Sequence, residues 1–597
     1  MVKTDKSKPG AKYQLSTTPR LLSSRTERLL VIAAIGFMAI VLTSSIRNES
    51  VTIDESLHIP AGISYWQARD LRLNLEHPPL LKMWSTLPLM FRHVAANYHG
   101  SAWTGGIQEE FARGIFQQWN SDIESLVFWA RVPMVLITLA LGLSIFYMAR
   151  SLAGSLGAFV SLLFFVTAPF FLAYGPLVLT DAGLALFACW TLWTFGSLWR
   201  DASTRTAAGF AIALSGAMLS KFSAILLFPC LVFAAALFSV QEAYQGNSKP
   251  TFWSLFAPLH RRSRFLMAGV IGSLGIVYLF YAVAGYRGPA SVVFASKIAS
   301  SPTRLGFLTK LVSFLRTHPI VDRLTSPILL YVSGMGRVLV GVSRRTFILG
   351  HWYSHGRWFY FPVLFLFKMT PGFLGATVLL GLLVGKYFLL KSQRQPMVPH
   401  QFQHQLRCLV IGFLVFVGAA IFSSLNIGIR HLSVPVALLT IFLSLTIPLV
   451  SLLVRQPQRR ALAVIVFLLV ASAAYSTLRA FPAYISYFNV LIGPQPKYNV
   501  SVDSNLDWGQ ALPAVREFSR THPGGIAIDY FGGIDPRTYV PNVTPWSCDA
   551  PLPAGTAWAV VTATSFVERG HCDYLLAYTH WALDGGSSLV FRTSLIP

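Results

Sequence analysis

The sequence predicts a polytopic α-helical membrane protein with a small α/β domain at its C-terminal end. Of the 597 residues, 54% are hydrophobic and only 12% are charged, whereas a soluble domain typically has about 25% charged residues. Many apolar runs reach roughly 20 residues, the length at which a helix crosses a bilayer. After residue 478 the composition changes to Pro, Gly and Asp clusters with short strand-like runs, which is typical of a folded domain outside the membrane.

The apolar runs predict about eleven transmembrane helices. An odd number of spans places the two ends of the chain on opposite sides of the membrane. The predicted spans are residues 29–46, 126–149, 152–173, 178–199, 206–220, 222–240, 265–284, 357–388, 408–425, 432–454 and 461–478.

Basic residues in the short loops predict the orientation. Loops on the N-terminal side of the membrane carry most of the Arg and Lys, which favours a cytoplasmic N-terminus and an external C-terminus. The run 29–46 is long for a signal peptide and lacks a small-residue cleavage site, so we expect an uncleaved first span. The loop cations are Arg150, Arg200, Arg205, Lys249, Arg261, Arg262, Arg264, Lys391, Arg394, Arg407, Arg455, Arg459 and Arg460.

These boundaries divide the chain into a basic cytoplasmic segment 1–28, a membrane domain 29–478 and an external domain 479–597. Two long outer loops, 47–125 and 285–356, belong to the membrane domain. The net charge of +24 does not indicate nucleic-acid binding, because the cations lie in short loops and not on a soluble basic domain. Loop 285–356 is also basic, and two interpretations stay open: amphipathic helices on the membrane surface, or a solvated loop.

In the external domain, Cys548 and Cys572 are candidates for a disulfide if that side is oxidising, but the sequence does not show whether they meet. The run 503–510, Asp-Ser-Asn-Leu-Asp-Trp-Gly-Gln, begins like a calcium loop. Its sixth position is Trp508 and its twelfth is Ala514, so an EF-hand is not expected. A turn before a helix at about 511–520 is the simpler interpretation.

The first outer loop contains the densest group of reactive side chains. The adjacent acids Asp54 and Glu55 follow the first span in a chain with only 24 acidic residues, and a partly desolvated carboxylate can act as a general base. His58 comes next. Further on, Glu76 and His77 precede a Pro-Pro corner, and Lys82 could place a point charge near a phosphate. The alternatives are that Asp54 and Glu55 are simply a solvated acidic pair, and that the Pro-Pro corner after His77 has a purely structural role.

Five more ionisable residues reach the same face in the predicted topology: Asp181, Lys221, Lys368, Arg430 and His431. Asp181 begins a span and is either a helix cap or a second site carboxylate. Arg430 and His431 also begin a span, where helix N–H groups add to their charge and favour a phosphate or pyrophosphate. Lys221 is either a ligand or a snorkelling interfacial cation.

These motifs resemble the membrane-embedded glycosyltransferases of the GT-C class, in particular the protein O-mannosyltransferase superfamily with its bacterial family 39 members. The family's Asp-Glu pair corresponds to residues 54–55, and its His-Pro-Pro-Leu-x-Lys motif to 77–82. Asp181 corresponds to the acidic residue that the family places after Leu-Thr. A variant of the family's Lys-x-Pro element begins at Lys368, and residues 428–431 match its Gly-x-Arg-His segment. The segment 503–510 resembles a signature of bacterial members with a C-terminal outer domain. The eukaryotic MIR insertion is absent, and Glu76-His77 stands where lipid A aminoarabinose transferases carry Glu-Lys.

The resemblance implies a GT-C fold in a bacterial-type inner membrane, with the active site facing the periplasm. It implies a polyprenyl-phosphate sugar donor and transfer of a mannose-like hexose to an acceptor hydroxyl, first of all on protein Ser or Thr, with inversion. Asp54, Glu55 and Asp181 are then the expected catalytic residues. The expected substrate-binding residues are His58, Glu76, His77, Lys82, Lys221, Lys368, Arg430 and His431. A divalent metal is compatible with the class but not required by these residues. The alternatives are transfer to lipid A or another glycolipid, and a lipid or solute transporter.

Overall fold

The computed structural model describes residues 24–246, 251–300, 306–339, 344–390 and 396–593. Within this part of the chain, nine helical segments are long and apolar enough to cross a membrane. The protein is therefore a polytopic helical membrane protein, as the sequence predicts. The segments are α1 (Ser24–Ser45), α6 (Ile123–Val166), α8 (Asp181–Arg200), α10 (Leu227–Gly246), α11 (Phe252–Ala284), α16 (Pro371–Leu389), α17 (Gln403–Ile421), α18 (Ser433–Leu443) with α19 (Thr446–Leu453), and α20 (Gln456–Ala480).

The count of nine differs from the predicted eleven at two places. The predicted spans 126–149 and 152–173 both fall largely on α6, which has a non-helical glycine, Gly154, at φ 75° and ψ −179°. The rings of Phe146 and Phe159 lie 5.4 Å apart, although 13 residues of straight helix would separate them by roughly 20 Å. The chain therefore reverses within α6 at a backbone conformation that favours glycine. The predicted span 206–220 is helix α9 (Thr204–Ser220), whose 17 residues are at the lower limit for a span.

The predicted span 357–388 is interrupted. It divides into α15 (Tyr360–Lys368) and α16, with Met369 and Thr370 between them. Pro371 at the start of α16 has no N–H to continue the preceding helix, and the Thr370 hydroxyl accepts the Phe373 N–H at 3.2 Å as a cap. The break places Lys368 at the end of a short helix.

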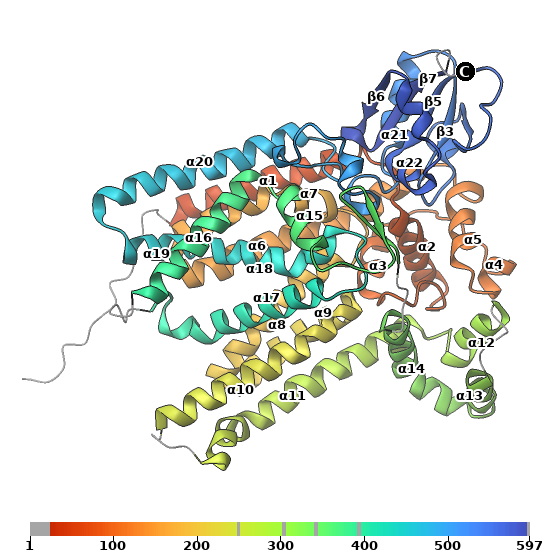
Figure 1. Ribbon diagram of the computed structural model, residues 1–597. Helices are drawn as coiled ribbons and strands as arrows, with labels where there is room; N and C mark the ends of the chain where they lie inside the picture. The colour runs from red at the N-terminus through yellow and green to blue at the C-terminus, as the bar shows by residue number, and fades with distance from the viewer. Residues whose placement is uncertain (1–23, 247–250, 301–305, 340–343, 391–395, 594–597) are drawn as a thin grey trace, which may run out of the picture.

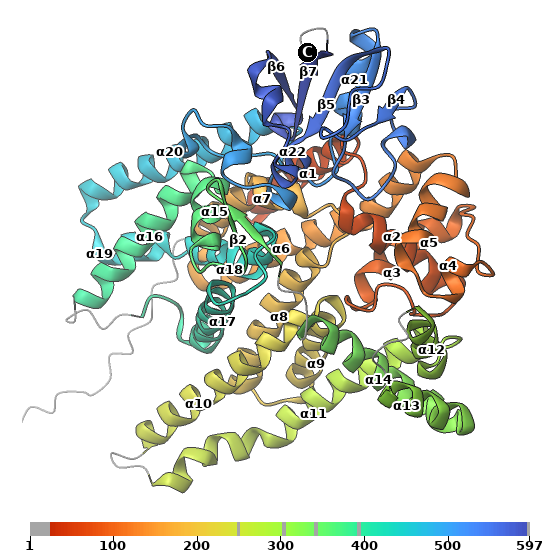
Figure 2. The same ribbon diagram turned by 45° about the vertical axis from the view of Figure 1, so that its right-hand side comes forward.

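The elements predicted outside the membrane gather at one end of the helical bundle, at the right in Figure 1. The first loop forms α2 (Ile53–Gln67), α3 (Leu80–Thr86), α4 (Ser101–Thr104) and α5 (Gln108–Arg113). The basic loop forms α12 (Ala290–Ser300), α13 (Gly306–Thr317) and α14 (Pro319–Leu339), followed by a hairpin of β1 (Thr346–Ile348) and β2 (His351–Tyr353). Figure 2 shows the same grouping from a second direction. The second loop is thus helical, while its contact with a membrane surface stays a prediction.

The C-terminal region forms a five-stranded mixed sheet in the order β4-β3-β5-β7-β6. The pairs β3–β4 and β3–β5 are parallel, and the pairs β5–β7 and β6–β7 are antiparallel. Cys548 and Cys572 are joined by a disulfide, with Cα atoms 5.5 Å apart. The strands are β3 (Gly525–Asp529), β4 (Val543–Pro545), β5 (Thr556–Thr562), β6 (His580–Leu583) and β7 (Ser588–Arg592), with helices α21 (Leu512–Thr521) and α22 (Ala563–Arg569).

Some sequence predictions fall outside the described residues. They concern most of the basic segment 1–28, namely residues 1–23, and the loop cations Lys249, Lys391 and Arg394. The side chain of Lys297 is also outside the described part.

Candidate active site

A chain of four alternating charges connects segments that are far apart in the sequence. Arg430 Nη1 lies 2.9 Å from Asp54 Oδ2 and 3.4 Å from Asp181 Oδ2, and Lys221 Nζ lies 2.7 Å from Asp181 Oδ1. The Asp54 side chain is 24% exposed, whereas those of Asp181 and Arg430 are 3% and 7% exposed. Asp54 is therefore the more exposed of the two carboxylates in this charge chain, whereas Asp181 lines the adjacent polar cavity.

Local helix geometry explains where these charges lie. Asp54 is in the first turn of α2, and Asp181 is the first residue of α8, so both acids face the positive end of a helix dipole. Lys221 directly follows the C-terminal end of α9, where a cation is favoured. Arg430 lies in a single 3₁₀ turn, Ile429–Leu432, before α18. Helix ends thus bring opposite charges together at one level of the bundle.

The C-terminal domain holds Arg430 in place. The guanidinium carbon lies 4.3 Å from the centre of the Trp508 ring, a cation–π contact. The Asn505 side-chain oxygen accepts the Ile429 N–H at 2.9 Å, and the Ser504 hydroxyl donates to the Ile427 carbonyl at 2.8 Å. The run 503–510 is therefore a support for the site. The sequence singled out this run without indicating that it contacts Arg430.

Asp503 lies at the start of this support. Its backbone has φ 56°, a left-handed conformation that is uncommon for a residue other than glycine. Burial raises the pKa of its carboxyl to about 6, although the Ser504 N–H and the Arg430 charge oppose the shift. Asp503 also lines a separate cavity of about 380 Å³ with Arg344, Arg345 and Trp352.

A cavity of about 290 Å³ opens beside the charge chain. Its polar lining consists mainly of Glu76, His77, Asp181, Lys221 and His431. A second cavity of about 250 Å³ is lined almost entirely by apolar side chains and shares Phe361 and Ala420 with the first. The arrangement places a polar end, with one lysine and two histidine side chains, next to an apolar chamber. The other residues of the second cavity are Pro362, Phe365, Thr377, Phe413, Val417, Ile421, Leu432, Pro435, Val436 and Leu439.

The two histidines of the first loop lie together. The rings of His58 and His77 meet edge to face at 4.9 Å, and His58 Nδ1 is 2.7 Å from the Val178 carbonyl oxygen. Burial, followed by the neighbouring His58, Lys82 and Lys221, holds the pKa of His77 well below its ordinary value. His77 is therefore a neutral imidazole at the cavity wall, able to form hydrogen bonds without adding charge.

Glu55 is turned away from the cavity. It is fully buried, and Arg131 on α6 donates to both of its carboxylate oxygens, at 2.8 and 2.6 Å. The Val178 N–H and both the N–H and hydroxyl of Thr52 donate to the same carboxylate. Burial alone would raise the pKa of Glu55, but Arg131 outweighs it and the pKa is lowered. This placement argues against the predicted catalytic role and for a structural one.

Arg131 is a residue that sequence reasoning missed. Its guanidinium is fully buried and also donates to the carbonyls of Ile46, Glu49 and Ser50 at 2.8 to 3.0 Å. It fastens the segment before α2 to helix α6. Through Glu55 it fixes the helix turn that carries Asp54.

Two predicted substrate-binding lysines are also used internally. Lys82 Nζ donates to the Tyr65 hydroxyl, to both the carbonyl and side-chain oxygens of Asn74, and to the His77 carbonyl, at 2.6 to 2.9 Å. Lys368 Nζ donates to the carbonyls of Ile485 and Asn505 at 2.7 and 2.6 Å. Both side chains are buried. Their positions argue for structural roles, in contrast to Lys221, which lines the cavity.

Among the described residues, one group of side chains has the spacing of metal ligands: Asp529, Cys548 and Cys572. The disulfide uses both of its sulfur atoms.

Residues 123–259 match the family model described as dolichyl-phosphate-mannose-protein mannosyltransferase. In this region the chain is similar to a family of membrane glycosyltransferases. The match confirms the resemblance to the protein O-mannosyltransferase superfamily for these residues, which include Arg131, Asp181 and Lys221. No curated protein sequence matches the chain.

Three solved structures of glycosyltransferases are similar to this chain at low identity. The Saccharomyces cerevisiae Pmt1–Pmt2 complex is 17% identical over 46% of this chain and 35% of its own, with a TM-score of 0.31. ArnT from Cupriavidus metallidurans, bound to undecaprenyl phosphate, is 12% identical over 96% and 99%, with a TM-score of 0.45. The Archaeoglobus fulgidus oligosaccharyltransferase is 10% identical over 94% and 73%, with a TM-score of 0.42. This chain thus spans about a third of the first of these chains.

Proposed function

We propose that this protein is a membrane glycosyltransferase that moves a hexose from a polyprenyl-phosphate donor to an acceptor hydroxyl, first of all on protein Ser or Thr, with inversion at the anomeric carbon. One observation carries the proposal: a polar cavity with cations on its wall adjoins an apolar chamber. A lipid-linked sugar has this same division, with a charged phosphate between a sugar and a hydrocarbon chain. The family match at residues 123–259 supports a donor of this kind.

The donor would lie across both cavities. The first isoprene units would occupy the apolar chamber between α15, α16, α17 and α18, where their burial is favourable. The phosphate would lie near Lys221 and His431, which line the polar cavity. Arg430 forms an ion pair with Asp181. Its positive charge would stabilise the leaving phosphate as the bond between the anomeric carbon and the phosphate oxygen breaks.

Asp54 is the proposed general base. Its Oδ2 is held by Arg430, which leaves Oδ1 to accept the proton of the acceptor hydroxyl. The acceptor oxygen then forms a bond to the anomeric carbon while the bond from that carbon to the phosphate oxygen breaks. Polyprenyl phosphate leaves with the bonding electron pair. One displacement of this kind inverts the anomeric configuration.

Asp181 has a positioning role in this proposal. It lies between Lys221 and Arg430 and contacts both, so it keeps two cations close together that would otherwise repel each other. Glu76 and His77 would form hydrogen bonds to sugar hydroxyls from the cavity wall.

The outward orientation of the site is part of the proposal. The charge chain lies at the end of the bundle where α2–α5 and the C-terminal sheet gather (Figure 1). The positive-inside pattern of the short loops supports a cytoplasmic position for the opposite end.

Transfer to a glycolipid is the second candidate, and one observation favours it. The cavity of about 380 Å³ combines Arg344 and Arg345 with Trp352, Tyr360 and Asn426. Paired guanidinium groups suit a phosphorylated acceptor, and aromatic rings with an amide suit a sugar face.

The test is a transfer assay with purified protein, a panel of polyprenyl-phosphate sugars, and either a Ser/Thr peptide or lipid A as acceptor. We expect turnover with at least one donor and an inverted product. Comparison with R344Q/R345Q separates the acceptors: a loss confined to lipid A would favour the glycolipid. Failure with every donor, together with transport of a lipid across vesicles, would contradict the enzyme proposal.

A further inference from the structure

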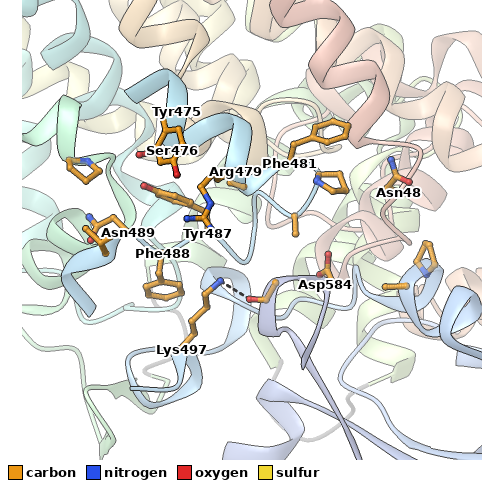
Figure 3. A pocket seen from close by; sticks show the side chains of 18 of the residues that line it. Asn48, Tyr475, Ser476, Arg479, Phe481, Tyr487, Phe488, Asn489, Lys497 and Asp584 are labelled. Atoms are coloured by element: carbon orange, nitrogen blue, oxygen red, sulfur yellow. Dashed lines mark hydrogen bonds between the residues drawn. The ribbon is translucent and has the colours of Figure 1, made fainter. Parts of the chain in front are cut away.

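A cavity that shares no residue with the charge chain lies at the end of α20. It has a volume of about 660 Å³ and separates the last turns of α20 from the C-terminal domain (Figure 3). Among the described residues, it shares no lining residue with the polar cavity or the apolar chamber. It is therefore a separate site at the end of a membrane-crossing helix.

Two cations from different segments reach this cavity. Arg479, in the last turn of α20, is exposed. Lys497 comes from the segment that enters the C-terminal domain, and its Nζ donates to the carbonyls of Ser486 and Gly585 at 2.8 and 2.6 Å. An ammonium has three N–H donors, so one is left for a ligand.

The two acids at the cavity are already engaged. Asp584 Oδ2 accepts hydrogen bonds from Ser587 at 2.7 Å, from Gln510 at 3.0 Å and from Ser486 at 3.4 Å. Glu517 forms an ion pair with Arg520 at 3.4 Å. The lining thus carries two cations and two acids, and partners within the protein hold both acids. The third N–H of Lys497 and the exposed Arg479 are the donors that an anionic group can use.

Aromatic side chains form the rim on the side of α20. Tyr475 and Phe481 are 63% and 46% exposed, and Figure 3 shows them with Tyr487 and Phe488 around the same space. The Arg479 guanidinium lies 5.9 Å from the Tyr475 ring centre. Tyrosine and arginine at the end of an apolar helix are typical of the boundary between hydrocarbon and headgroups. The rim therefore has the composition expected of a surface at this boundary, with the two cations at its polar edge.

We propose that this cavity binds the phosphodiester headgroup of an anionic phospholipid in the leaflet next to the C-terminal domain. Arg479 and Lys497 hold the phosphate, and Tyr475 and Phe481 lie against the first part of the acyl chains. The lipid contacts both sides of the junction, α20 on one side and the C-terminal domain on the other. Because binding stabilises the state that binds, the lipid strengthens the attachment of the domain whose Trp508 supports Arg430.

Native mass spectrometry of the full-length protein in detergent tests the proposal. Phosphatidylglycerol is titrated against wild type, R479Q and a matched control, R460Q, which removes the same charge from the other end of α20. We expect R479Q to weaken the phosphatidylglycerol affinity about fivefold, the effect of one cation near an anionic lipid surface, and R460Q to change it less than twofold. K497Q provides a second variant on the other side of the cavity, with folding checked by its melting temperature.

If R479Q and R460Q weakened the phosphatidylglycerol affinity equally, the lipid would be attracted by the overall charge of the protein and not by a specific site, which would overturn the proposal. Phosphatidylethanolamine binding as tightly as phosphatidylglycerol would overturn the preference for an anionic headgroup. Inorganic phosphate at millimolar concentration should not displace the lipid; full displacement would assign the cavity to a soluble anion instead. An unchanged affinity in both R479Q and K497Q would refute the proposal directly.

Discussion

Replacement of Glu55 by glutamine distinguishes a structural from a chemical role for this acid. The Glu55 carboxylate accepts hydrogen bonds from Arg131, Val178 and Thr52 in a fully buried position. E55Q removes the negative charge and leaves the Arg131 guanidinium buried without its partner. Breaking a buried ion pair in this way costs about 3–5 kcal/mol of the free energy of unfolding. The amide NH2 group would also face donors, which adds to the loss.

The double variant E55Q/R131M separates the two roles. Replacing both charges by neutral groups of similar size removes the unpaired charge, although the carbonyls of Ile46, Glu49 and Ser50 still lose their Arg131 donor. We therefore expect E55Q and R131M each to be strongly destabilised, and the double variant to be less destabilised than the sum of the two single variants. If Glu55 only holds the turn that carries Asp54, the folded double variant should also retain sugar transfer to within about tenfold of wild type.

The assay is thermal unfolding followed by tryptophan fluorescence in detergent, with sugar transfer measured on the same preparations. A double variant that is as stable as wild type but loses about 10²–10⁴-fold in rate, the usual contribution of an acid–base group, would refute the structural role. An E55Q protein that keeps full stability would refute the energetic reasoning.

Two further predictions concern Trp508 and Glu49. W508L removes the ring beneath Arg430 and should lower kcat about 3- to 30-fold, the equivalent of one cation–π contact, although Arg430 itself is unchanged. The control variant W546L should not change kcat. Equal decreases in kcat in the two variants would contradict the proposal that Trp508 supports Arg430. Burial raises the pKa of Glu49 from 4.5 to about 8. The folded state therefore binds more protons than the unfolded chain between these values, and stability falls as pH rises through that window. E49Q removes this titration, so its gain in melting temperature over wild type should grow from pH 5 to pH 8; a gain independent of pH would contradict the assignment.

The membrane helices could be predicted because each apolar run carries its own signal. Their boundaries were less certain where one residue changes the chain path, as at Gly154, or where Pro371 interrupts a run. The sequence predicted that Asp54 and Arg430 lie at the same face of the membrane, because the predicted topology places their loops on the same side. The ion pair itself required the structure.

Side chains with buried partners could not be assigned from sequence. Glu55 has the same chemistry as Asp54 and lies beside it, but a helix turn points it toward Arg131, 76 residues away. Lys82 looked like a phosphate ligand, yet four oxygen acceptors of its own loop surround it. Residue type indicates charge, whereas the available partners depend on packing between distant segments. Trp508 was visible as part of a motif, and its contact with Arg430 depends on how the C-terminal domain docks.

The most direct test of the proposed function is single-turnover transfer by D54N, with D535N as the matched control: the Asp535 side chain in the C-terminal domain is also 24% exposed and also forms an ion pair with an arginine. The measurement uses a radiolabelled polyprenyl-phosphate sugar, and donor binding is determined on the same samples. With Asp54 as the general base, we expect the rate of D54N to fall about 10²–10⁴-fold while donor affinity stays within a few-fold of wild type and D535N is unaffected. A D54N rate within threefold of wild type would contradict the proposal that Asp54 accepts the acceptor proton.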